Sequence, residues 1–183
     1  MLKLFAVVLG GRAQGCSIEL HDVVFTVAHS IEDAFPVLVN KWFGTSKRLH
    51  IDSIIELTSV DGHQVQITKE KSTSSEKLFM VNFGGYKKDY FGEIHEFKFF
   101  VGANKNEVLT RAKKVLALEL SESHCDDNID IDEVLSLEVV DDYHLQLIPG
   151  GESSELKIQS KYLRLDVPEI IAQAQALRDP ISI

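Results

Sequence analysis

Hydrophobic positions in the first part of the chain change from the spacing of strands to that of a helix. Residues 3–9 and 18–27 are rich in β-branched and aromatic side chains, and glycines lie between the two segments. This pattern is typical of a β-hairpin with a longer loop. After Ser30, apolar residues recur every three or four positions as far as Trp42, which predicts an amphipathic helix.

The strand pattern returns after this helix. Residues 51–60 and 64–68 again combine β-branched and apolar side chains, and Asp61-Gly62 separates them. An Asp-Gly pair between two such segments is a strong signal for a two-residue hairpin turn. The order of elements predicted for residues 1–68 is therefore β-β-α-β-β.

The same pattern occurs a second time, so the chain is predicted to be a tandem duplication. Residues 3–11 reappear as residues 77–85, an offset of 74, and residues 50–57 reappear as residues 130–137, an offset of 80. The second copy therefore carries six extra residues, which we place around residues 121–127 between its helix and its third strand.

Both predicted helices begin with a capping signal. Ser30 is followed three residues later by Asp33, and Asn104 is followed by Glu107, close to the capping-box pattern. In the first copy Pro36 falls early in the helix and is expected to shorten or bend it.

The predicted fold class is α+β, with antiparallel sheets because hairpins pair their strands in that way. We divide the chain into two β-β-α-β-β repeats, a polar linker and an extension with a strand at residues 156–159 and a helix opened by Pro168. The boundaries are 1–68 for the first repeat, 69–76 for the linker, 77–148 for the second repeat and 149–183 for the extension.

Strand phase predicts which side chains face the helices. In both copies the odd-numbered face carries a Glu-x-His pair followed by apolar residues, so we expect this face to pack under the helix. The opposite face of the first hairpin is also apolar, which predicts self-association of the chain through Ala6, Val8, Leu20 and Val24.

Charge and cysteine content narrow the possible partners. The 183 residues carry a formal net charge of −9, which argues against non-specific binding to nucleic acids. There is no apolar run of the length that a membrane span needs. Two cysteines, Cys16 and Cys125, are too few for a disulfide scaffold, so we expect a cytoplasmic protein. No cofactor or metal is assigned from the sequence.

The Glu-x-His pairs are the strongest candidates for chemistry. Glu19 and His21 share one face of a strand, and so do Glu93 and His95. A carboxylate beside an imidazole can orient a general base or take part in a metal site. The structural interpretation is that these side chains hold the glycine turns or helix starts by hydrogen bonds.

Other polar positions have weaker support. Arg12 lies in a glycine loop that could receive an anion, but a strand follows where nucleotide-binding motifs require a helix. Cys16 is close to Glu19 and His21, although the second copy has Tyr90 at its position. The acidic residues 126–132 do not have the glycine and glutamate spacing of an EF-hand.

Four segments carry a family resemblance. Residues 10–22, 30–33, 42–44 and 50–53 resemble the bacterial family labelled domain of unknown function 1543. Members of that family carry one or two copies of the module, so the resemblance implies a module at residues 3–68 and another at 77–148. The first copy is the closer match. The resemblance implies no reaction and no catalytic residues.

Two hypotheses for function remain open. The first is a non-catalytic module that binds a protein or a small ligand and self-associates. The alternative is a small hydrolase-like or metal-dependent enzyme that uses Arg12, Cys16, Glu19 and His21. The sequence favours the module, because no catalytic signature is complete.

Overall fold

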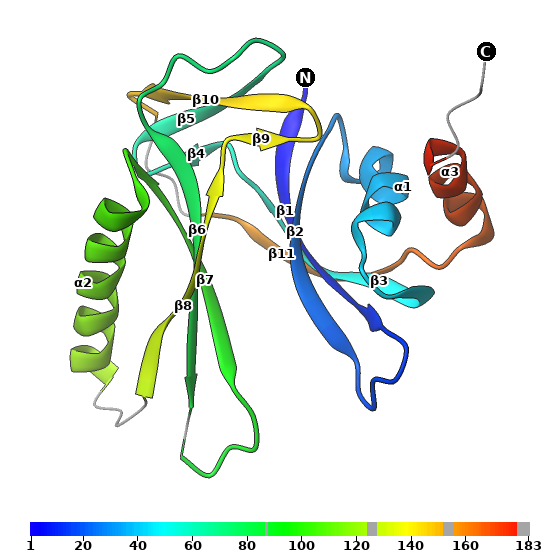
Figure 1. The fold of residues 1–183 in the computed structure, drawn as a ribbon, viewed down its shortest axis with the longest axis horizontal. Helices are drawn as coiled ribbons and strands as arrows, with labels where there is room; N and C mark the ends of the chain where they lie inside the picture. Colours follow the sequence, from blue (N-terminus) through cyan, green and yellow to red (C-terminus); the bar gives the residue numbers. More distant parts are fainter. Residues whose placement is uncertain (87, 124–127, 152–155, 179–183) are drawn as a thin grey trace. The chain divides into compact units, whose positions relative to one another are not determined.

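The computed structural model describes the chain except for residues 87, 124–127, 152–155 and 179–183. The fold is α+β with antiparallel sheets, as predicted (Figure 1). The chain forms two compact units, the first made of residues 1–58 and 155–183 and the second of residues 59–154. Each unit is described separately below.

The first unit is a four-stranded antiparallel sheet with two helices. Its strand order is β11-β3-β1-β2. The elements are β1 (Lys3–Arg12), β2 (Leu20–Ala28), α1 (Ile31–Lys41), β3 (Thr45–Glu56), β11 (Ile158–Arg164) and α3 (Pro168–Arg178). The predicted C-terminal strand and helix are therefore both present, and the strand begins two residues later than expected.

Helices α1 and α3 lie side by side over one face of this sheet (Figure 1). The amide of Asn40 on α1 donates a hydrogen bond to the carbonyl oxygen of Ala174 on α3, at 2.9 Å. The core below the helices includes Phe5, Val7, Leu9, Val24, Leu38, Trp42, Leu49, Ile51 and Leu165. The members of this core that come from the strands, such as Val7, Val24 and Ile51, lie on one face of the sheet.

The start of α1 has the predicted capping box. The hydroxyl of Ser30 accepts a hydrogen bond from the Asp33 backbone, and the Asp33 carboxylate accepts one from the Ser30 backbone. The helix continues through Pro36 to Lys41. Pro36 is the sixth residue of the helix, beyond the first four N–H groups that lack a partner inside it, so it removes one backbone hydrogen bond without ending the helix.

The second unit contains a three-stranded sheet, a helix and a second, four-stranded sheet. The strand orders are β7-β6-β8 and β4-β5-β10-β9. The elements are β4 (Ser59–Val60), β5 (His63–Thr68), β6 (Lys77–Tyr86), β7 (Ile94–Gly102), α2 (Lys105–Ser123), β8 (Asn128–Leu137), β9 (Val139–Val140) and β10 (Tyr143–Pro149). Helix α2 covers one face of the three-stranded sheet, where Phe79, Val81, Phe83, Phe100, Val108, Ala112 and Val134 form a core.

The two copies have the same order of elements, which agrees with the predicted duplication. Each ends in a short hairpin whose turn residues have left-handed backbone, with φ of 49° at Asp61, 73° at Gly62, 51° at Asp141 and 62° at Asp142. Positive φ at both central residues is the requirement of a type I′ turn. Helix α2 is longer than α1 and ends at Ser123, so part of the predicted insertion is helical. The rest, at residues 124–127, lies outside the described residues.

The hairpins of the two copies pair with each other inside the second unit. Strand β5 of the first copy lies antiparallel to β10 of the second, with Gln66 opposite Gln146. Asp61, in the turn before β5, accepts hydrogen bonds from the Val101 backbone at 2.8 Å and from Arg111 at 2.7 Å. The compact units therefore do not follow the repeat boundaries: residues 59–68 group with the second repeat, and the C-terminal extension from residue 155 onward groups with the first.

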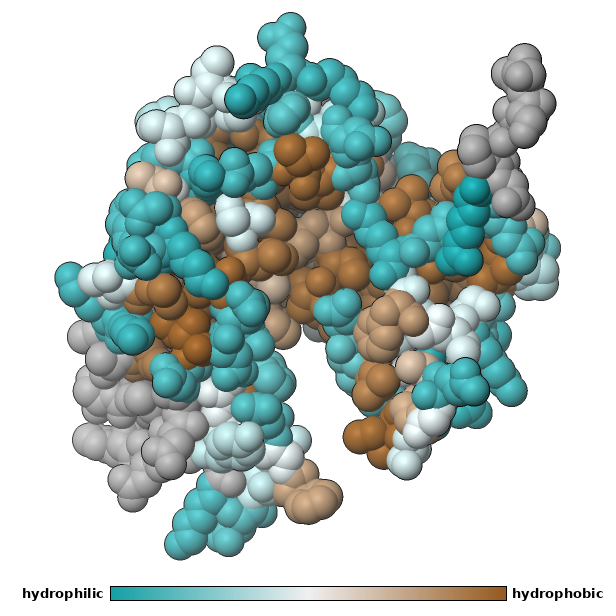
Figure 2. Space-filling view, in the orientation of Figure 1, coloured by the Kyte–Doolittle hydropathy of each residue, from teal (hydrophilic) through white to brown (hydrophobic). Residues whose placement is uncertain are grey.

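The segment between β5 and β6 has the polar character predicted for residues 69–76. It runs along the top of the view in Figure 1, and the same region is covered by hydrophilic side chains in Figure 2. Within the segment, the Ser72 and Ser74 hydroxyls accept hydrogen bonds from backbone groups two residues further on. These local turns replace the pairing that a strand would give.

The predicted strand phase was wrong in both copies. Val24 packs under α1 and Phe100 under α2, so the even-numbered residues of β2 and β7 face the helices. The face predicted for self-association is divided for the same reason. Leu20 and Val24 pack with the helix-side core, whereas Ala6 pairs with Phe25 on the other face and is buried. The four residues therefore do not form the apolar patch on which the prediction of self-association was based. Self-association stays a prediction, which light scattering can test.

Candidate carboxylate and histidine clusters

A row of three residues crosses the first sheet on the face that α1 and α3 do not cover. Gly10 on β1 lies opposite His21 on β2 and opposite His50 on β3. Residues directly opposite each other in a sheet point to the same face. A Cβ atom on Gly10 would lie only 2.5 Å from His50 Nε2 and 2.6 Å from Asp52 Oδ2. Glycine is therefore required in the middle of the row, because polar side-chain atoms occupy the space above it.

A β-bulge directs Asp52 toward this row. Ile51 pairs with Leu9 and Ser53 pairs with Val8, so Asp52 is an extra residue with no partner on β1. Bulges reorient side chains and are frequent beside functional sites. Here the bulge places the Asp52 carboxylate beside both imidazoles.

The four side chains Glu19, His21, His50 and Asp52 form a closed ring, which we call the first cluster. His21 Nε2 lies 3.2 Å from an Asp52 oxygen and 3.7 Å from Glu19 Oε1. His50 Nε2 lies 3.3 Å from the other Asp52 oxygen and 3.5 Å from the same Glu19 atom. Each imidazole nitrogen therefore faces two carboxylates, and each carboxylate faces two imidazoles.

These separations are longer than those of most other ion pairs that the described residues form. His63 Nε2 lies 2.6 Å from Glu76, and Lys3 Nζ lies 2.9 Å from Glu56. Charge-assisted hydrogen bonds are typically 2.7–2.9 Å long. All four contacts of the first cluster are longer than this. Among the residues that the structure describes, the only buried side-chain polar atom without a hydrogen-bond partner is Asp52 Oδ2.

His50 is the buried member of the first cluster. Its side chain is 2% exposed, whereas that of His21 is 52% exposed. His50 Nδ1 lies 2.7 Å from the carbonyl oxygen of Arg48. Since a carbonyl can only accept, Nδ1 carries a hydrogen, and in the neutral ring the lone pair belongs to Nε2. That lone pair points toward the carboxylates.

The C-terminal extension supports His50 from behind. Arg48 has left-handed backbone with φ of 62°, and its N–H donates to Asp166 Oδ2 at 3.0 Å. Asp166 also accepts a hydrogen bond from Arg164 Nε at 2.8 Å. The ring of Tyr162 on β11 packs against the His50 ring, with centroids 4.3 Å apart and a tilt of 34° between the planes. A chain of contacts thus runs from the extension through Arg48 to the imidazole.

The contacts of Asp166 with Arg48 and Arg164 depend on the negative charge of its carboxylate. The hydrogen bond from Arg164 lowers the pKa of Asp166 from its ordinary 3.8, and the same bond raises the pKa of Arg164. A lowered pKa in the folded state adds stability above the unfolded pKa, and this is lost as the pH falls through the folded value.

We expect Asp166→Asn to lower the free energy of unfolding at pH 7 by up to about 1 kcal/mol, the range of a surface ion pair. The difference from the wild type should be constant at neutral pH and should disappear on acidification below pH 3.8. Urea unfolding followed by circular dichroism at several pH values measures it. A difference that persists at about pH 2 would show that the carboxylate charge is not the cause.

The second unit carries an equivalent group, which we call the second cluster: Glu93, His95 and Asp132. His95 Nε2 lies 3.6 Å from Glu93, and His95 Nδ1 lies 3.5 Å from Asp132. One potential ligand atom from each side chain can be chosen so that all lie within 4.8 Å of one another. The bulge is repeated, because Asp132 falls between paired residues of β8, and Gly84 lies opposite His95.

The structure therefore brings together some of the residues predicted from the sequence and not others. Glu19 and His21 join the first cluster, and Glu93 and His95 the second, on the faces away from the helices. Arg12 donates to the Ser17 carbonyl oxygen, and Cys16 Sγ accepts from the Ala13 backbone. Both of these contacts lie within the β1–β2 loop.

Sequence reasoning missed His50, Asp52 and Asp132 as members of a site. The repeat contained the signal, since the offset of 80 aligns Asp52 with Asp132, and the offset of 74 aligns His21 with His95. A search for polar residues at equivalent positions of both copies would have found the three Asp, Glu and His positions that the clusters share.

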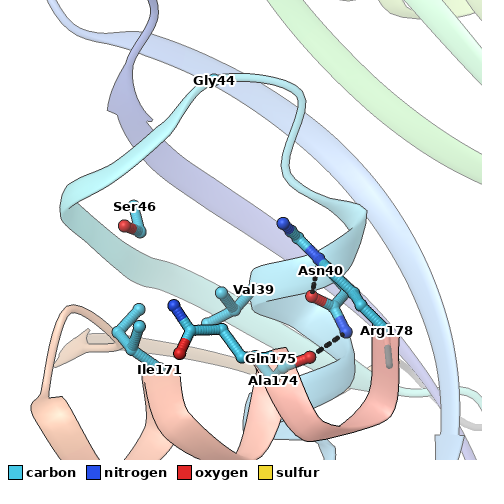
Figure 3. Close-up of a pocket in the computed structure, with 8 residues that line it drawn as sticks. All are labelled: Val39, Asn40, Gly44, Ser46, Ile171, Ala174, Gln175 and Arg178. Carbon is cyan, nitrogen blue, oxygen red and sulfur yellow. Dashed lines mark hydrogen bonds between the residues drawn. The ribbon is translucent and has the colours of Figure 1, made fainter. Parts of the chain in front are cut away.

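Two pockets, one in each unit, lie away from the clusters. One of about 120 Å³ opens between α1 and α3, where Asn40 accepts a hydrogen bond from Arg178 (Figure 3). Its lining is Val39, Asn40, Gly44, Ser46, Ile171, Ala174, Gln175 and Arg178. A second pocket, of about 230 Å³, lies in the second unit beside residues 71–77. Neither includes a residue of the clusters.

Comparison with known proteins identifies the family. The family model described as Domain of Unknown Function (DUF1543) matches residues 16–67. The crystal structure of the protein Il1583 from Idiomarina loihiensis is similar to this chain, with 33% sequence identity and a TM-score of 0.69. The match covers 90% of this chain and 98% of Il1583. The chain belongs to the DUF1543 family.

The DUF1543 match occurs once, in the first repeat, so the predicted resemblance of the second repeat is not matched by the family model. The matched segment contains all four side chains of the first cluster. A comparison with curated proteins finds no match. Within the described part of this DUF1543 protein, none of the helices has the length and apolar character needed to cross a membrane.

Proposed function

We propose that this DUF1543 chain is a metal-binding module, and that the first cluster holds a divalent transition metal such as Zn²⁺. Imidazole nitrogens and carboxylate oxygens are the ligands of such ions. The observation that carries the proposal is the orientation of His50. Its Nδ1–H is fixed on the Arg48 carbonyl, and its Nε2 faces two carboxylates.

The hydrogen bond of His50 to a backbone carbonyl is the usual arrangement behind a metal ligand, because it fixes the tautomer and the ring orientation. A neutral imidazole lone pair facing two carboxylates is unfavourable unless a positive charge lies between them. A proton on Nε2 would favour separations of about 2.7–2.9 Å. The observed separations of 3.2–3.7 Å leave room for a larger cation.

The sides of the ring are close to the spacing of ligands around a first-row metal, but no three of its side chains offer ligand atoms that all lie within 4.8 Å of one another, so an ion would have to draw the half-exposed Glu19 and His21 inward. Ligand atoms about 2.1 Å from a tetrahedral ion lie about 3.4 Å from their neighbours. The four separations between an imidazole Nε2 and a carboxylate oxygen lie on both sides of this value, with Asp52 presenting a different oxygen to each ring. Two carboxylates and two neutral imidazoles carry a charge of −2, which a divalent cation neutralises.

The proposal is for binding and not for catalysis. The enzyme alternative required Arg12 and Cys16 beside Glu19 and His21, and both make their contacts inside the β1–β2 loop. The exposure of His21 supports access of the ion from solvent, since half of its side-chain surface is open.

The proposal is tested by calorimetric titration of the metal-free chain with Zn²⁺, together with thermal unfolding. We expect one tightly bound equivalent, and stabilisation by about 2.7 kcal/mol when free Zn²⁺ is 100 times its dissociation constant. Co²⁺ in its place should give the intense visible absorption of a tetrahedral site.

His21→Ala should remove the tight equivalent, because it deletes a half-exposed ligand with little effect on the core. The matched control is His63→Ala, which removes another histidine paired with a carboxylate, at 2.6 Å from Glu76. It should bind Zn²⁺ as the wild type does. Unchanged Zn²⁺ affinity in a folded His21→Ala chain would refute the proposal.

A further inference from the structure

The second cluster repeats the skeleton of the first. In each, a glycine lies opposite the histidine of a Glu-x-His pair, and a bulged aspartate sits on the other neighbouring strand. A Cβ on Gly84 would overlap the carboxylate of Asp132, just as one on Gly10 would meet Asp52. The space above both glycines is thus filled by carboxylate oxygens.

The second cluster has a different set of ligand atoms. The place of His50 is taken by Asp130, which lies opposite Gly84 on β8. The second cluster therefore offers one imidazole and two carboxylates, with a further carboxylate in the same row. Carboxylate oxygens are harder ligands than imidazole nitrogens, and oxygen-rich sets suit cations such as Mn²⁺.

An amide takes part in the second cluster where the first copy has an apolar residue. Asn82, at the position of Val8, accepts a hydrogen bond from His95 Nδ1 at 3.3 Å and donates to Asp132 at 3.5 Å. It therefore contacts the ring and the carboxylate at the same time. The ring of His95 stands between the two carboxylates, with Nε2 3.6 Å from Glu93 and Nδ1 3.5 Å from Asp132.

The two clusters differ in exposure only through His50, which is 2% exposed and has no equivalent imidazole in the second cluster. The three positions that the clusters share are 33–52% exposed in the first cluster and 36–41% exposed in the second. A cation in the second cluster would keep several water ligands, which suits ions that lose water reluctantly. It would also be bound more weakly, since solvent competes for each ligand.

We propose that the second cluster is a separate, weaker cation site that takes an oxygen-preferring divalent ion of the Mn²⁺ type. The inference extends the proposed function, because it takes the first cluster as the site for the nitrogen-preferring metal. The protein would then hold two unlike cations on equivalent positions of its repeats.

The test uses Mn²⁺ alone as the probe and follows the paramagnetic resonance signal of free Mn²⁺ during titration with the full chain. The wild type should reduce this signal. Gly84→Ala should weaken Mn²⁺ binding at least tenfold, because the added methyl group displaces the exposed Asp132 carboxylate while backbone pairing of β6 is kept. His95→Ala should have the same effect, and His63→Ala should have none.

One equivalent of Zn²⁺, added first, should leave most of the Mn²⁺ binding in place, because it fills the first cluster. If His21→Ala removes tight Zn²⁺ binding but Gly84→Ala and His95→Ala leave Mn²⁺ binding unchanged, the second site is refuted and the proposed function stands. If Gly84→Ala removes Mn²⁺ binding while His21→Ala keeps tight Zn²⁺ binding, the proposed function fails and the second site stands. Absence of Mn²⁺ binding by the wild type would overturn the inference directly.

Discussion

Gly10→Ala is expected to weaken Zn²⁺ binding by more than about 100-fold. The added methyl group would lie 2.5 Å from His50 Nε2 and 2.6 Å from Asp52 Oδ2, so both side chains must move. Loss of a supporting contact around a metal already costs 10–100-fold in affinity. Displacement of two ligands at once should exceed that range. Titration with Zn²⁺ at constant pH measures the change.

The control for this variant is Gly92→Ala. The three atoms nearest to a Cβ at Gly92 all belong to the ring of Tyr90, which is exposed and can shift. Gly92→Ala should bind Zn²⁺ like the wild type. Circular dichroism reports whether Gly10→Ala keeps the fold, and a folded Gly10→Ala chain with wild-type affinity would contradict the assignment of His50 and Asp52 as ligands.

Trp42→Ala is expected to lower the free energy of unfolding by about 3–5 kcal/mol, the usual range for removal of a buried aromatic side chain. Trp42 follows the last residue of α1 and is 5% exposed. Its Nε1–H donates to the Thr45 carbonyl oxygen at 3.1 Å, and its ring lies against Gly11. The variant leaves a cavity and an unpaired carbonyl group where α1 meets β3.

Phe43→Ala is the comparison for this variant, because the neighbouring ring is 59% exposed. Its loss should cost much less, since most of its surface remains in water. Trp42 is the only tryptophan, so unfolding of both variants must be followed by circular dichroism rather than by fluorescence. Equal losses in the two variants would show that Trp42 does not hold the core.

The order of elements was predictable because each carries a local signal. The capping box at Ser30 and the turn at Asp61-Gly62 act within a few residues, and both are confirmed. The same signals occur in both copies. The short hairpin at the end of the second copy could therefore be recognised, although its turn contains Asp141-Asp142.

The faces of the strands could not be assigned from one strand at a time. Val24 and Phe25 are neighbours on β2, so they point to opposite faces, yet both are buried. Alternation of apolar and polar residues is therefore weak in this strand. The pairing of Gly10 with His21 decides the phase, and such pairing is a long-range property.

The candidate site was predicted only as far as its local pairs. Glu19 and His21 are two residues apart and stand out in the sequence, whereas His50 and Asp52 join them from β3. The bulge at Asp52 has no sequence signature of its own. The same bulge occurs at Asp132 in the second copy, which shows that the bulge belongs to the module.

The pairing of Gln66 with Gln146 has a consequence for the origin of the chain. These two residues are equivalent in the repeat, and around them Val65 pairs with Leu147 and Ile67 with Leu145. The contact is therefore isologous, with a local twofold axis between the two glutamines, as in a symmetric homodimer. A polypeptide with a single copy would expose β5 as an open sheet edge, and a second molecule could cover it with the same strand. Fusion of two such molecules would turn an interface between subunits into a sheet within one chain.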